Sequence, residues 1–111
     1  MKRNPAVLSL LIVDDEEEFA LALASRLELR GMRVRCAFSG EQGLAALREE
    51  PADVLLLDMR MPGMSGVGVL RALRRDKAVP GASAMPVIIV SGHADMADIE
   101  EAEKIGIQGY V

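Results

Sequence analysis

A short run of large apolar residues that ends on a carboxylate is the feature that most constrains this chain. Residues 54–57 read Val-Leu-Leu-Leu, Asp58 follows them, and the next loop contains Pro62, Gly63 and Gly66. A short segment that is apolar on both faces is typical of a strand in the middle of a parallel sheet. Asp58 is therefore expected at the carboxyl edge of such a sheet, where open α/β sheets bind ligands.

Four other segments are predicted to be strands. Two of them, residues 8–13 and 87–90, are nearly continuous apolar runs. Residues 33–37 alternate between polar and apolar, which indicates an edge strand with one face in water. Residues 109–111 read as the first residues of a fifth strand.

Segments with helical spacing separate these strands. After residue 16, Phe19, Leu23 and Leu27 recur every four residues, so all three are expected to face the sheet. Ser65 is expected to cap a later helix, and a fourth helix is expected to begin near Asp95. The arginines of the helix after Ser65 are expected to face solvent: Arg71, Arg74 and Arg75.

The alternation of strands and helices predicts an α/β fold with a doubly wound, five-stranded parallel sheet. With the alternating strand at the edge, the spatial order becomes the flavodoxin-like 2-1-3-4-5. The chain order reverses between the first and third strands, so a crevice is expected at that point. Asp14, Asp15 and Asp58 would line the crevice, and Ser91 would reach it from the neighbouring strand.

Size and composition narrow the class of protein. The 111 residues, of which 27% are charged, fit one domain with a single packed core. No apolar run approaches the roughly 20 residues of a membrane helix, and no leader pattern is evident, so a cytoplasmic location is expected. The net charge of −4 and the 3% aromatic content argue against direct nucleic-acid binding. The single cysteine, Cys36, is expected to be a buried thiol.

The expected cluster of three carboxylates has a definite chemistry. Two unit charges 4 Å apart repel by about 4 kcal/mol at an effective dielectric constant near 20. Such a cluster persists by sharing a proton, by raising a pKa or by binding a cation. An all-oxygen ligand set favours Mg²⁺. A carboxylate beside Mg²⁺ can attack a phosphoryl group to form an acyl phosphate, and the Ser91 hydroxyl could then hold a phosphoryl oxygen.

Each of these residues alone has a simpler explanation. A pair such as Asp14-Asp15 is commonly a helix cap with a solvated surface, and Ser91 alone would be a turn residue. The placement of all of them at the ends of apolar strands, in the right order, favours a functional site.

Four segments of the sequence together resemble a known family. The segments are residues 11–16 (LIVDDE), 56–66 (LLDMRMPGMSG), 90–94 (VSGHA) and 109–111 (GYV). They resemble the receiver domains of bacterial two-component response regulators, in the chemotaxis-regulator-like superfamily. The resemblance extends over nearly the whole chain.

The resemblance implies that Asp58 accepts a phosphoryl group from a sensor histidine kinase or a phosphotransfer protein. It also implies a Mg²⁺ ion held by Asp15, Asp58 and the backbone carbonyl of Arg60. Asp14 would act on this ion largely through a bound water. In the family, the positions of Arg60 and His93 influence how fast the acyl phosphate hydrolyses.

The resemblance also implies a conformational switch. Ser91 would move toward the phosphoryl oxygen, and Tyr110 would turn inward in response. The face formed by the fourth helix and the fifth strand would then change its binding of an effector domain or partner protein. This face could also support a homodimer.

The family pattern continues beyond Tyr110 with a lysine and a last helix, whereas this sequence stops at Val111. We therefore expect residues 1–111 to form one receiver domain that is incomplete at its C-terminal end, with the fifth strand and last helix truncated.

Three functional readings follow from the sequence. In the first, the chain is a signalling switch that catalyses only its own phosphorylation and dephosphorylation. In the second, it is a receiver-like scaffold that works without phosphorylation. In the third, it is a Mg²⁺-dependent phosphatase with an Asp nucleophile. Such phosphatases commonly carry a second Asp two residues after the first, and Arg60 at that position disfavours this reading.

Overall fold

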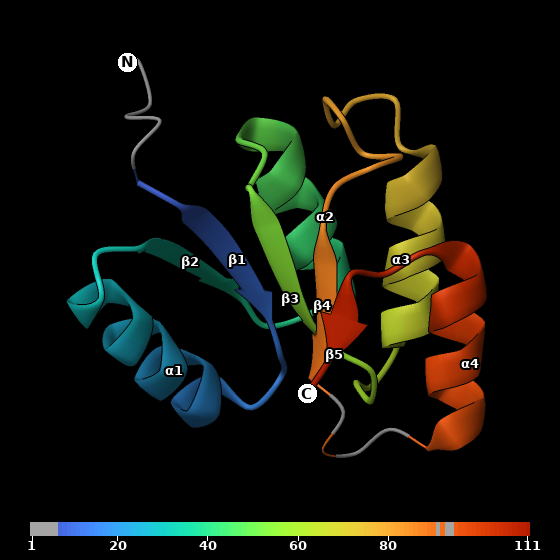
Figure 1. The fold of residues 1–111 in the computed structure, drawn as a ribbon, viewed down its shortest axis with the longest axis horizontal. Coiled ribbons are helices and arrows are strands. Elements are labelled where there is room, and N and C mark those ends of the chain that lie inside the picture. The colour runs from blue at the N-terminus through green and yellow to red at the C-terminus, as the bar shows by residue number, and fades with distance from the viewer. Residues whose placement is uncertain (1–6, 91, 93–94) are drawn as a thin grey trace.

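The structure is a computed structural model that describes residues 7–90, 92 and 95–111. Strands and helices alternate along these residues (Figure 1): β1 (Ser9–Val13), α1 (Glu17–Leu29), β2 (Arg33–Ala37), α2 (Gly40–Glu49), β3 (Val54–Asp58), α3 (Gly66–Arg75), β4 (Val87–Val90), α4 (Met96–Ile105) and β5 (Gly109–Tyr110). The longest helix, α1, has 13 residues, and no helix in the described ranges has the length and apolar character needed to cross a bilayer.

The five strands form one parallel sheet in the order β2-β1-β3-β4-β5, which confirms the predicted fold class and strand order. Val13 at the end of β1 pairs with Leu57 in β3, and Leu57 pairs with Ile89 in β4. The strand order reverses between β1 and β3. The carboxyl ends of these two central strands therefore lie side by side at one edge of the sheet.

Helices cover both faces of the sheet (Figure 1). On one face, apolar residues of α2, α3 and α4 pack against β1, β3 and β4 to form the main core, with Leu11, Leu57 and Ile89 fully buried. On the other face, α1 lies against β1 and β2. Alternate residues of the central strands, such as Leu11 and Val13 in β1 and Leu55 and Leu57 in β3, are buried in the main core.

The prediction that Phe19 faces the sheet is wrong. Phe19 is 44% exposed, whereas Ala20 and Ala24 are buried against the sheet, with Leu23 and Leu27 partly buried beside them. A step of four residues rotates about 40° past a full turn of an α-helix, so residues spaced by four drift around its surface. The small alanines allow α1 to approach the sheet closely, and Phe19 is left at the edge of that contact.

Arg74 is also placed differently from the prediction. Arg71 and Arg75 are exposed as expected, but the Arg74 guanidinium donates to the carbonyl oxygens of Ala82, Met85 and Gly106 at 2.7 to 3.0 Å. Partial burial lowers the pKa of Arg74 from its usual value. The side chain thus links the long α3–β4 loop to the end of α4.

The Cys36 thiol is partly buried beside α1, and its Sγ donates to the carbonyl oxygen of Ala20 at 3.6 Å. Burial, and to a lesser extent the charge of Glu28, raises the pKa of this thiol above its ordinary value. The thiol is thus less buried than predicted, and its raised pKa disfavours the reactive thiolate form.

Gly66 packs closely against the backbone at the end of β3, and this contact generates a stability prediction. A Cβ at Gly66 would lie 2.6 Å from the Asp58 carbonyl oxygen and 2.6 Å from Met59 Cα, neither of which can rotate away. We expect Gly66→Ala to lower the free energy of unfolding by about 1–3 kcal/mol, measured by urea denaturation.

Gly68, on the same helix, is the matched control. A Cβ there would meet the flexible Met64 side chain at 3.3 Å. Gly68→Ala should leave stability unchanged or raise it by about 0.5–1 kcal/mol, because alanine favours helix. Equal destabilisation by the two substitutions would contradict the close approach at Gly66.

Candidate functional site

The candidate site is built on the carboxyl ends of β1 and β3. Asp14 follows the last residue of β1, and Asp58 is the last residue of β3. Because Val13 pairs with Leu57, the sheet register sets these two aspartates next to each other. Both are buried, with 5% of Asp14 and 4% of Asp58 exposed.

Asp15 completes a cluster of three carboxylates. One carboxylate oxygen from each of Asp14, Asp15 and Asp58 lies within 4.8 Å of the other two. Oxygens this close repel strongly when charged, and the repulsion is relieved by a shared cation. A donor set made only of carboxylate oxygens, two of them buried, fits a hard divalent ion such as Mg²⁺.

Backbone amides orient the two buried carboxylates. The Glu16 N–H donates to Asp14 Oδ1 at 2.9 Å, and the Arg60 N–H donates to Asp58 Oδ1 at 3.2 Å. In both cases the donor lies two residues after the aspartate, so the turn that ends each strand also aims its side chain. The carboxylates are therefore preorganised rather than free to rotate.

A cleft of about 300 Å³ opens beside the two buried aspartates. Glu16, Phe19 and Val90 line it together with Asp14 and Asp58. Phe19, which is 44% exposed, contributes an apolar side chain to this lining. The cleft lies at the crevice that the reversal of strand order predicts.

The structure brings together the three aspartates that the sequence analysis placed in one crevice, and their chemical roles stay predictions. Ser91 and His93 lie outside the described residues. Tyr110 lies on β5, pairs with Ile89 across the sheet, and is 49% exposed.

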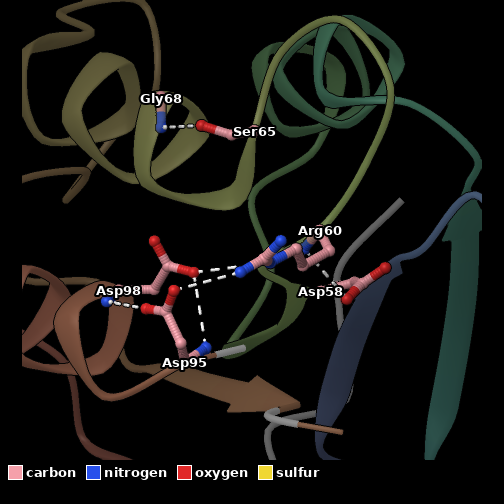
Figure 2. Close-up of polar contacts among 6 residues, drawn as sticks. All are labelled: Asp58, Arg60, Ser65, Gly68, Asp95 and Asp98. Atoms are coloured by element: carbon pink, nitrogen blue, oxygen red, sulfur yellow. Dashed lines mark hydrogen bonds and ion pairs between the residues drawn. The ribbon is translucent and has the colours of Figure 1, made fainter. Parts of the chain in front are cut away.

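The side chain of Arg60 takes a direction that the sequence analysis did not anticipate. Figure 2 shows its backbone beside Asp58 and its guanidinium turned toward the start of α4. Arg60 Nη2 lies 3.1 Å from Asp95 Oδ2, and Arg60 Nε lies 3.6 Å from Asp98 Oδ2. Asp95 and Asp98 lie 35 and 38 positions after Arg60 in the sequence, and no sequence pattern links residues so far apart. These ion pairs are therefore visible only in the folded structure.

An open, doubly wound α/β sheet with an acidic cluster at its carboxyl edge defines a class of proteins that bind ligands at that edge. The family model for the response regulator receiver domain matches residues 10–111. The chain belongs to this family, the receiver domains of two-component response regulators.

Sequence relatives include two transcriptional regulatory proteins. KdpE of Mycobacterium tuberculosis is 39% identical over 101 residues, which are 91% of this chain and 42% of that protein. AfsQ1 of Streptomyces coelicolor is 35% identical over 103 residues, which are 93% of this chain and 43% of that protein. The chain thus spans less than half the length of these relatives.

Solved structures of similar fold include a response regulator receiver protein from Pseudomonas putida. It superposes with a TM-score of 0.87 at 25% identity and covers 97% of this chain and 87% of that chain. The N-terminal domain of a response regulator receiver protein from Methanoculleus marisnigri gives a TM-score of 0.81 at 30% identity, covering 94% of this chain and 82% of that chain.

The carboxylate cluster predicts that Mg²⁺ stabilises the folded chain. At a Mg²⁺ concentration ten times its dissociation constant, the gain is about 1.4 kcal/mol, visible as a rise in Tm. Asp15→Asn removes one negative ligand and should abolish most of this rise. Without Mg²⁺ the same variant should be no less stable than the unchanged chain, because it carries less repulsion.

Glu103→Gln on α4 serves as the control for a general loss of charge, since Glu103 is exposed and is not part of the cluster. Its Mg²⁺ response should match that of the unchanged chain. If Mg²⁺ raised the Tm of the Asp15→Asn variant by the same amount, the cluster would not be the binding site.

Proposed function

We propose that Asp58 is the phosphoacceptor of this receiver domain and takes its phosphoryl group from a phosphohistidine on a sensor histidine kinase or phosphotransfer protein. The observation that carries this proposal is the convergence of carboxylate oxygens from Asp14, Asp15 and Asp58 within 4.8 Å at the carboxyl edge of the sheet. The adjacent cleft leaves Asp58 beside a space that a phosphoryl group can enter.

In this proposal an Asp58 carboxylate oxygen attacks phosphorus, an O–P bond forms, and the P–N bond of the phosphohistidine breaks with the electron pair returning to the imidazole. Mg²⁺ would neutralise part of the phosphoryl charge. Asp15, Asp58 and the Arg60 carbonyl would hold the ion, and Asp14 would act on it through a bound water. The Arg60 N–H bond to Asp58 Oδ1 orients the carboxylate for attack.

The readout is proposed to pass through Ser91 and Tyr110. Ser91 would bond to the phosphoryl oxygen, and Tyr110, which is half exposed, would turn inward. The face of α4 and β5 would then change its affinity for an effector domain, a partner protein or a second copy of the chain. In this proposal the domain is cytoplasmic and makes no membrane contact, and its net charge of −4 disfavours direct contact with nucleic acid.

The acceptor role of Asp58 is tested by incubating the chain with Mg²⁺ and acetyl phosphate carrying labelled phosphorus. The chain should gain one phosphoryl group, and hydroxylamine should release it, because hydroxylamine cleaves acyl phosphates. Asp58→Asn should lose the label entirely, since an amide oxygen is a poor nucleophile.

Asp53→Asn is the matched control on the same segment. Asp53 immediately precedes β3, at the opposite end from Asp58, and its Oδ2 accepts from the Ser9 N–H at 2.8 Å. Asparagine keeps that acceptor, so labelling should persist. An unlabelled parent chain would favour a scaffold that works without phosphorylation, and repeated turnover of phosphomonoesters would favour a phosphatase.

A further inference from the structure

We propose that Arg60 is a phosphoryl-responsive latch between the acceptor site and α4. In the unphosphorylated chain its guanidinium holds the first turn of α4 through Asp95 and Asp98. A phosphoryl group on Asp58 draws the guanidinium away and frees that turn. The proposal rests on the acceptor role of Asp58 and adds a second route by which the site acts on α4.

The geometry places Arg60 between two groups of acids. Its backbone N–H is 3.2 Å from Asp58 Oδ1, whereas its guanidinium is paired with Asp95 at 3.1 Å and Asp98 at 3.6 Å (Figure 2). The backbone is thus already at the acceptor carboxylate. Rotation of the side chain alone can redirect the guanidinium from α4 to a group attached to Asp58.

The first turn of α4 depends on the same two acids. Asp95 is the N-cap of the helix and accepts from the Asp98 N–H at 2.9 Å, and Asp98 in turn accepts from the Asp95 N–H. Their negative charge suits the helix N-terminus, where the amide groups carry partial positive charge. Because Arg60 pairs with both side chains, it holds the capping box as a unit to the β3–α3 loop.

Charged side chains from this loop and from the start of α4 meet across the space between them. A cleft of about 520 Å³ lies there, lined by Arg60, Pro62, Ser65 and Asp98 among others. The side chains of Arg60 and Asp95 are 54% and 59% exposed, so each ion pair is weak and screened by water. A weak link of this kind can be broken by a modest new attraction.

A phosphoryl group supplies that attraction. It adds negative charge and three oxygen acceptors in one place, and the planar guanidinium matches phosphate oxygens in a bidentate arrangement. Before phosphorylation, a divalent ion would neutralise much of the charge of the acidic cluster. The cluster would then compete poorly with Asp95 and Asp98 for the Arg60 guanidinium. After phosphorylation, the added negative charge on Asp58 attracts the Arg60 guanidinium more strongly than Asp95 and Asp98 do.

The test compares three variants of the chain by amide hydrogen exchange at Asp98 and Ile99, whose N–H groups bond to Asp95. Arg60→Gln removes the guanidinium. Asp95→Asn with Asp98→Asn removes the charges but keeps side-chain oxygens for the caps. Glu101→Gln is the control. It removes the ion pair between Arg71 of α3 and Glu101 of α4, which lies outside the acidic cluster.

Without any phosphoryl group, Arg60→Gln and the double Asn variant should exchange these amides about three- to tenfold faster than the parent chain, as expected when two exposed ion pairs are lost. Glu101→Gln should match the parent chain at these two amides. Equal exchange in the parent and Arg60→Gln chains would overturn the latch, whatever the chemistry of Asp58.

Mg²⁺ with beryllofluoride then mimics the phosphoryl group. Exchange in the parent chain should rise to the level of Arg60→Gln, and Arg60→Gln should show no further rise. An equal rise in both chains would overturn the latch. Phosphoryl uptake from labelled acetyl phosphate is measured in parallel on portions of the same protein without beryllofluoride, so normal uptake without an exchange response refutes the latch alone, whereas absent uptake refutes the acceptor role.

Discussion

Electrostatic repulsion among Asp14, Asp15 and Asp58 is the constraint on which the rest of this structure depends. The sheet register holds two of these carboxylates together in a buried position, and the third adjoins them within 4.8 Å. Repulsion at this range is of the order of several kcal/mol unless it is compensated. The buried apolar residues of β1 and β3 supply the packing that keeps the acids together. A bound divalent cation would supply the charge that makes the arrangement favourable.

The fold places these carboxylates in a cleft and fixes their orientation. The reversal of strand order between β1 and β3 opens a cleft where both strands end, and backbone N–H groups of Glu16 and Arg60 aim the buried carboxylates within it. Gly66 lies directly behind Asp58, so the start of α3 and the end of β3 form one close-packed unit.

The sequence predicts the sheet order and the three aspartates because both follow from local patterns. Each apolar run is short and ends on a polar residue, and parallel strands bring such ends to one edge. Side-chain directions depend on packing between distant segments and are not predicted as well. Phe19 follows a helical spacing but lies at the cleft. Arg74 donates to three carbonyl groups that lie up to 32 positions away from it in the sequence. The direction of the Arg60 side chain is also not predicted, because its partners on α4 are distant in the sequence and become neighbours only in the fold.

The most direct test of the central claim, that three carboxylates form one divalent-cation site, is a crystal structure of the chain grown with Mn²⁺, a hard ion that takes the same oxygen ligands as Mg²⁺. The anomalous signal of manganese locates the ion independently of any assumption about its ligands. We predict one strong peak within bonding distance of carboxylate oxygens of Asp15 and Asp58. A crystal with no peak there, or with its peak on another acidic surface, would contradict the account.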